Sequence, residues 1–353
     1  MPARADHRST TPPAGSLLHG VALTPVAFVQ AVMRAFEHRG LAGDDALKAA
    51  QIAPSDLNNP AHRVTAAQFE ALSAAAMQQL DDEALGWFSR PLPWGSYGML
   101  ARASLSAPTL GVALKRWCRH HGLLTRDISL SLQTAGDDAR IILTEHRPPG
   151  GDGTLREFCH VSVLRNVHGL ACWLVDSRIP LRGASFTFDA PAHTDAYAVL
   201  FDGPARFGAE QTGIHFDARY LGLPIKRDEA AMTQMLQRAL PIQVRPYRRD
   251  RLLVQRVRQL LSTRPQDTRN ADDVAALLNT SARSLHRQLR DEGASLQALK
   301  DEVRRERAMN LLQRSGKPVK QVAEAAGFQN EKSFIRAFKG WTGMTPGEWR
   351  GQA

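Results

Sequence analysis

The sequence has few cysteines and no long apolar run. Only three of its 353 residues are cysteine, Cys118, Cys159 and Cys172, and they form no CxxC pair. This excludes the disulfide framework of a small secreted protein and argues against a structural zinc site with four ligands. The N-terminal segment lacks the apolar stretch of a signal peptide, and no uncharged run of about 18 apolar residues follows. We therefore expect a cytoplasmic protein that does not bind a membrane.

Motifs of common enzyme classes are also missing. The sequence contains neither GxSxG nor HExxH, and the GGDG run at 150–153 lacks the Lys-Ser or Lys-Thr pair of a phosphate-binding loop. Five cysteines and histidines come close enough in sequence to suggest a metal site, but no pattern fixes a fourth ligand and such cysteines usually pack in the core: Cys118, His120, His121, Cys159 and His160. We expect no enzyme, no cofactor and no metal.

Charge is unevenly divided along the chain, whose formal net charge is +10. From Arg245 to the end there are 22 Lys or Arg against 12 Asp or Glu, a net of +10, whereas residues 1–244 hold 23 of each kind. A neutral body joined to a strongly basic C-terminal part predicts a polyanionic partner for that part alone.

The first 230 residues mix helical and strand patterns, which predicts one α+β domain. The expected elements are helices over 24–39, 65–80, 108–121 and 155–175, a β-hairpin of 128–132 with 140–144, a strand over 184–188, and short strands and turns over 201–216. Thr24 is the expected cap of the first helix. Val112, Trp117 and Cys118 are expected on the buried side of the third.

Two prolines and a charge run mark a linker, LPIQVRPYRRD, at 240–250. Beyond it only helical patterns occur, over 251–261, 272–278, 282–292, 296–313, 319–326, 331–339 and 346–350. We divide the chain into a flexible tail (1–19), an α+β domain (20–238), a linker (239–250) and an all-α domain (251–353). The linker arginines either contact phosphate or are simply solvated, and the sequence favours neither: Arg245, Arg248, Arg249 and Arg251.

Two segments of the all-α domain repeat one pattern. DDVAALLNTSARSLHRQLRDEG and VKQVAEAAGFQNEKSFIRAFKGWTG each combine a short helix with a Val-Ala pair, a tight turn and a basic amphipathic helix. Apolar residues four apart point inward together: Leu285 and Leu289 in the first segment, Phe334 and Phe338 in the second. This is the pattern of a helix-turn-helix, whose second helix enters the major groove of DNA.

Polar residues on the second helices then face outward. They are Arg283, His286, Arg287 and Arg290 in the first segment, and Lys332, Ser333, Arg336 and Lys339 in the second. Arg and Lys pair with guanine, while shorter side chains contact neighbouring bases and phosphates. The helix expected over 296–313 spans roughly 26 Å at 1.5 Å per residue. Successive major grooves lie about 34 Å apart, so one chain could contact both if protein or DNA bends.

These segments resemble the DNA-binding domain of the AraC/XylS family of bacterial transcription regulators. The resemblance covers 264–350 and is most specific in AAGFQNEKSFIRAFKGWTGMTPGEWR. The matching residues are Gly327, Phe328, Ser333, Phe334, Arg336, Ala337, Phe338, Trp341, Gly343, Pro346 and Arg350. Gly327 would permit the central turn, and Gly343 with Pro346 would set the last one.

The resemblance implies that seven residues contact DNA: Arg283, His286, Arg287, Glu331, Lys332, Ser333 and Arg336. Glu331 is unusual there, because a carboxylate repels phosphate. It either accepts a hydrogen bond from cytosine N4 or caps its own helix, and we favour the cap.

The N-terminal domain resembles the arabinose-binding-like effector domain of one branch of these regulators, that of ornithine-utilisation and virulence regulators. The resemblance covers about 24–224 and rests on GSYGMLARASLSAPTLGVALKRW and FDGPARFGAEQTGIHFDARYLGLP. It implies a domain that senses a small molecule and dimerises, with fatty acids, amino acids or amines all allowed as effectors. A nearby aromatic group either lines an effector pocket or forms core, and we favour core: Trp87, Phe88, Trp94 and Tyr97.

Together these patterns predict a sequence-specific transcription regulator. The expected form is a homodimeric activator, controlled by a small-molecule effector, that binds promoter DNA and contacts RNA polymerase. The alternative is a ligand-independent architectural protein that uses the same double helix-turn-helix and binds DNA without sequence preference.

Overall fold

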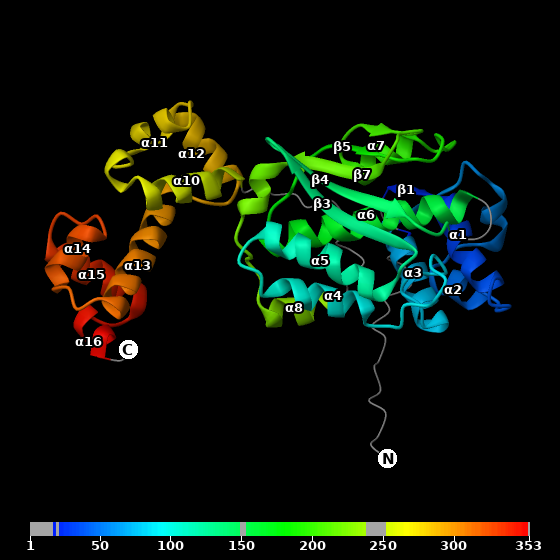
Figure 1. The fold of residues 1–353 in the computed structure, drawn as a ribbon, viewed down its shortest axis with the longest axis horizontal. Coiled ribbons are helices and arrows are strands. Elements are labelled where there is room, and N and C mark those ends of the chain that lie inside the picture. The colour runs from blue at the N-terminus through cyan, green and yellow to red at the C-terminus, as the bar shows by residue number, and fades with distance from the viewer. Residues whose placement is uncertain (1–16, 19–20, 149–152, 238–251, 352–353) are drawn as a thin grey trace, which may run out of the picture. The chain divides into compact units, whose positions relative to one another are not determined.

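The computed structural model describes residues 17–18, 21–148, 153–237 and 252–351 (Figure 1). Contacts divide the chain into two compact units, Met1–Arg248 and Arg249–Ala353. The predicted linker at 239–250, the four arginines in and beside it, most of the predicted tail and all but the last residue of the GGDG run lie outside the described residues.

The N-terminal unit combines helices with two sheets, in which only β5 and β6 pair in parallel among the described strands. Its helices are α1 (Val26–Glu37), α2 (Asp44–Ala49), α3 (Ala66–Leu80), α4 (Ser96–Leu105), α5 (Leu110–Leu124), α6 (Gly153–Val175), α7 (Asp195–Phe201) and α8 (Glu229–Leu236), with 3-10 turns η1 (Pro54–Asn58) and η2 (Ala218–Gly222). Its strands are β1 (Ala22–Pro25), β2 (Arg63–Thr65), β3 (Ile128–Ala135), β4 (Asp138–Glu145), β5 (Leu181–Ser185), β6 (Ala205–Arg206) and β7 (Thr212–Asp217). β1 pairs with β2, and the other five form a sheet in the order β3-β4-β7-β5-β6.

Helix α6 is the centre of this unit. Of its 23 residues 17 are buried, so it is covered on nearly every side rather than along one stripe. It packs against α1, α5 and the strands β4 and β7 (Figure 1). Within the part of the chain that the structure describes, no helix is both long and apolar enough to cross a bilayer.

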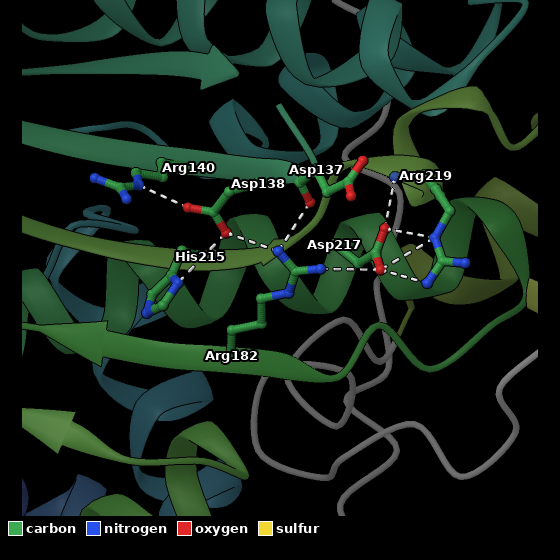
Figure 2. A network of polar contacts seen from close by, with 7 residues as sticks. All are labelled: Asp137, Asp138, Arg140, Arg182, His215, Asp217 and Arg219. Atoms are coloured by element: carbon green, nitrogen blue, oxygen red, sulfur yellow. Dashed lines mark hydrogen bonds and ion pairs between the residues drawn. The ribbon is translucent and has the colours of Figure 1, made fainter. Parts of the chain in front are cut away.

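The two faces of the five-stranded sheet differ in character. Ala139, Ile141 and Leu143 alternate along β4 and are buried on the side of the helices. The other face carries a charge network (Figure 2), in which Asp138 of β4 lies directly opposite Asp217 of β7. Arg182 of β5 contacts both carboxylates, at 3.4 and 3.1 Å, and offsets their mutual repulsion.

The predicted α+β class is confirmed, with local corrections. Thr24 is not the cap of α1, because Pro25 takes that position with extended backbone angles. Val112 is half-buried, unlike Trp117 and Cys118. The strand expected at 184–188 begins and ends three residues earlier, as β5. Four short helices were not predicted, because each is brief and only weakly periodic: α2, α4, α7 and α8.

The C-terminal unit is helical throughout its described residues. It consists of α10 (Leu252–Thr263), the 3-10 turn η3 (Pro265–Asp267), α11 (Ala271–Leu277), α12 (Ala282–Asp291), α13 (Leu296–Arg314), α14 (Val319–Ala325), α15 (Glu331–Thr342) and α16 (Pro346–Gly351). Each of the seven predicted helices is present, with boundaries displaced by at most three residues.

Helix α13 belongs to two separate cores. Its first half gives Leu296, Leu299 and Val303 to a cluster with α10, α11 and α12. Its second half gives Ala308 and Leu312 to a cluster with α14 and α15. One 19-residue helix, about 28 Å long at 1.5 Å per residue, thus holds both helix pairs.

Candidate nucleic-acid interface

The first helix pair, α11 and α12, meets at a tight turn. Asn279 adopts the left-handed conformation there, with φ of 55°. α12 then begins after Ser281, whose Oγ accepts a hydrogen bond from the backbone N–H of Ser284 at 3.1 Å. A side-chain cap of this kind fixes where the helix starts and therefore which residues face outward.

The second pair, α14 and α15, repeats this construction. Gly327 occupies the turn with φ of 83°, as predicted, where a side chain would be strained. Asn330 Oδ1 accepts from the backbone N–H of Ser333 at 2.8 Å and begins α15. Gly343, with φ of 77°, ends it, and Pro346 begins α16. Both predicted helix-turn-helix motifs are therefore present.

Buried pairs set the orientation of both second helices. Leu285 and Leu289 of α12 are fully buried, as are Phe334 and Phe338 of α15. All seven residues expected to contact DNA are exposed on the remaining surface of these helices: Arg283, His286, Arg287, Glu331, Lys332, Ser333 and Arg336. The structure brings them onto two helices of one unit, three on α12 and four on α15.

The cationic side chains of this set form no ion pair with the described residues of the unit. Among the described residues, no carboxylate pairs with any of four exposed cations, which remain available to phosphate or base edges: Arg283, Arg287, Lys332 and Arg336. Arg258 of α10 shows the contrast, because it contacts Glu302 at 3.0 Å and also Glu306, and so fastens α10 to α13. Charge thus has two separate uses in this unit.

The preferred role of Glu331 was wrong. Asn330 is the cap of α15, while Glu331 is the first residue of the helix and its side chain is exposed. A carboxylate in the first turn still interacts favourably with the helix dipole.

Sequence reasoning missed two supports of this surface. Asn279 provides in the first turn what Gly327 provides in the second, and Asn is the usual substitute for Gly in that conformation. Arg304 of α13 lies 5.2 Å from the ring centroid of Phe328, which itself packs 5.4 Å from Phe334. The signal for Asn279 was its position in the repeat, because it follows Ala275 by four residues, as Gly327 follows Ala323.

The side chains discounted as a metal site are placed in the N-terminal unit. Cys118 and Cys159 are buried, and burial raises the pKa of the Cys118 thiol to about 12. No three His, Cys, Asp or Glu side chains come together as ligands within the described ranges.

The aromatic group near residue 90 is split. Trp87 and Phe88 are buried, as the core interpretation predicts, whereas Trp94 is 54% exposed and lies outside the core. Trp87 also borders a pocket.

Each of the two units contains a segment that matches a known protein family. Residues 40–225 match the arabinose-binding domain found at the N-terminus of AraC transcription regulators, and residues 274–352 match a helix-turn-helix domain. The ornithine utilization regulator of Pseudomonas aeruginosa is 28% identical over 329 residues, which cover 93% of this chain and 96% of the relative. VirS of Mycobacterium tuberculosis is 30% identical over 175 residues, covering 48% and 50%.

Among solved structures, that of CdpR from Pseudomonas aeruginosa has a TM-score of 0.35 and 23% identity, and covers 90% of this chain and 98% of its own. The sequence relatives above are named as regulators rather than enzymes, in agreement with the expectation that the chain is not an enzyme. The N-terminal domain match, which spans more than half of the chain, and the helix-turn-helix pair lead to one assignment. The chain belongs to the family of AraC-type transcription regulators with an arabinose-binding N-terminal domain.

Proposed function

We propose that this regulator is an activator controlled by a small molecule that binds its N-terminal domain. The proposed domains are an effector and dimerisation domain (20–238), a linker (239–250) and a DNA-binding domain (251–353), preceded by a tail (1–19). Its partners are promoter DNA, RNA polymerase and a second copy of the chain, which places it in the cytoplasm.

The observation that carries this proposal is the pair of exposed basic helices, α12 and α15, fastened to one connecting helix. We assign contact with base edges or phosphate to Arg283, His286, Arg287, Lys332, Ser333 and Arg336, and a contact with cytosine N4 to Glu331. Two such helices on one rigid connection suit adjacent major grooves on one side of DNA.

Effector control follows as a shift between populations. A ligand that binds the N-terminal domain better in one arrangement of the two domains raises the population of that arrangement. In the proposed mechanism, the favoured arrangement places a dimer on repeated sites beside RNA polymerase.

Selection from a random DNA library with the full-length protein tests sequence-specific binding. We expect enriched sites with two half-motifs about one helical turn apart. The double variant Arg287→Ala/Arg336→Ala should lose this enrichment while retaining the melting temperature of the wild type, because both side chains are exposed. Strong binding without any enriched motif would support the architectural alternative and contradict the proposal.

A further inference from the structure

The N-terminal unit contains a pocket walled by aromatic rings. It lies between α1, α3, α6 and α7, and Phe28, Phe69, Trp87 and Phe158 belong to its lining. The rings pack against one another, with Phe158 centred 5.5 Å from Phe28 and 5.4 Å from Trp87. About 60 Å³ of the pocket is open to a water-sized sphere, room for roughly four to six of them at about 10 to 15 Å³ each.

Several residues that line this pocket have buried polar atoms without a hydrogen-bond partner among the described residues. Four buried atoms of lining residues have no hydrogen-bond partner among the described residues: Ser73 Oγ, Trp87 Nε1, Arg165 Nε and Asn166 Oδ1. Buried polar atoms in folded proteins are normally paired, so four on one pocket require an explanation. Three of the four can donate a hydrogen bond, which favours a ligand rich in acceptors.

Arg165 adds a positive charge to these donors. It interrupts the apolar helix α6, is only 7% exposed, and gives one terminal N–H to the carbonyl of Leu200. Burial lowers its pKa to about 10, so the guanidinium is still charged at neutral pH. No carboxylate within the described ranges forms an ion pair with it.

Two acidic residues nearby do not supply the missing counter-charge. Asp202 acts on Arg165 electrostatically, but its Oδ2 is held by Arg178 Nε at 2.9 Å. Glu70 also lines the pocket, but it already has an interaction partner. A buried charge without a counter-ion is costly, and a bound anion would remove that cost.

We propose that this pocket is the effector site and that it takes a small monocarboxylate with an apolar body. The carboxylate pairs with Arg165 and accepts from the neighbouring donors, while the body packs against the rings of Phe28, Phe69 and Phe158. This inference rests on the proposed effector control and names its ligand class.

Other ligand classes fit the lining less well. A sugar such as arabinose presents hydroxyl groups all round, which an aromatic wall would leave without partners. A simple amine would bring a second positive charge toward Arg165. A carboxylate on a short alkyl chain or a single ring would neutralise the charge of Arg165 and place its apolar body against the aromatic rings.

The test uses the full-length protein and two acids, hexanoate and phenylacetate, each beside its own amide. Amides keep the shape of the acids and lose the charge. We expect both acids to raise the melting temperature in a saturable way and the amides to bind at least about tenfold more weakly. Equal binding of acids and amides would overturn the proposed ligand class.

Variants locate the binding. Arg165→Gln should reduce acid affinity at least about tenfold. Because this buried position is sensitive, Ser73→Ala provides a second variant. Its hydroxyl has no hydrogen-bond partner in the described part of the chain, so removing it should weaken acid binding several-fold at unchanged stability. Arg182→Gln, the same charge change on the outer sheet face, is the control and should bind acids as the wild type does.

DNA affinity, measured with and without acid, separates this inference from the proposed function. Acid binding that depends on Arg165 and changes affinity for the selected site supports both. Acid binding that depends on Arg165 without any such change supports the pocket and contradicts effector control by this ligand class. Acid binding unaffected by both pocket variants, or no acid binding, overturns the pocket assignment. If the amides nevertheless changed DNA affinity, effector control itself would still be supported.

Discussion

At the scale of single residues, each side chain proposed to contact DNA can be tested separately, because it is exposed and outside the core. Arg336 is exposed near the middle of α15, two residues before the buried Phe338. If it pairs with a base, Arg336→Ala should weaken binding to the selected site by about 1 to 3 kcal/mol and binding to random DNA much less. Titration of both DNAs by fluorescence anisotropy measures the two losses. Arg140→Ala, on the sheet of the other unit, should change neither, and equal losses on both DNAs would make Arg336 a phosphate contact.

Also at this scale, His121 makes stability depend on pH. It is buried in α5 against Phe88, at 6.1 Å between ring centroids, and burial lowers its pKa to about 4. The unfolded chain takes up the proton near pH 6.5, whereas the folded protein does not until pH falls to about 4. As the pH is lowered from about 6.5 to about 4, the free energy of unfolding should therefore decrease, by about 1.4 kcal/mol per pH unit for this one group.

Urea unfolding at several pH values measures this slope. Burial lowers the pKa of His160 and His168 to about 4 as well, so His121→Leu should lessen the slope without abolishing it. His146→Leu, at an exposed position, should leave it in place. A slope that His121→Leu does not alter would assign the pH dependence to other buried groups.

At the scale of elements, α13 is the helix that joins the two cores of the C-terminal unit. Arg307 is exposed and lies between the residues that α13 gives to its two cores. Arg307→Pro should cost about 3 kcal/mol and break the rigid connection, because proline removes a backbone hydrogen bond and clashes with the preceding turn. Footprinting should then show one protected half-motif, or none, where Arg307→Ala still protects two. Protection of both half-motifs by the proline variant would contradict a rigid connection.

The same scale explains what the sequence could predict. The helices from α10 to α16 have apolar residues at regular spacing and side-chain caps such as Ser281 and Asn330, signals that are local to each segment. β5 was displaced because ASFTF is the most strand-like stretch nearby, whereas the ladder that decides the strand is formed with β7, some 30 residues later. Pairing between distant segments leaves little local signal.

At the scale of the whole molecule, the basic charge of the C-terminal third makes DNA binding sensitive to salt. Each phosphate neutralised by a Lys or Arg adds about 0.9 to the slope of log K against log salt concentration. Lys332→Gln should lower this slope by about one unit and weaken selected and random DNA alike. Titrations between about 50 and 200 mM salt would measure the slope. An unchanged slope would mean that Lys332 does not contact phosphate.

The pocket also belongs to this scale, which is why the sequence suggested only Trp87 among its lining residues and favoured a core role for it. Its lining comes from segments as far apart as Phe28, Trp87 and Arg165. One clue was present in the chain: Arg165 is the only charged residue between 158 and 175, within a helix otherwise suited to a core. A lone charge in such a helix is either paired by the fold or kept for a ligand, and only three-dimensional contacts distinguish the two.

The continuity of α13 fixes the rotation of α15 relative to α12 as well as the distance between them. Since an α-helix turns by about 100° per residue, inserting one residue between its two cores would rotate α15 by that amount about the axis of α13 relative to α12. The second recognition helix would then face away from the DNA that the first one contacts. An insertion of seven residues, close to two full turns, would restore the facing but move the helices about 10 Å further apart. The spacing of the proposed half-motifs would therefore depend on the helical phase of this single element, and related chains should tolerate substitutions in α13 far better than insertions.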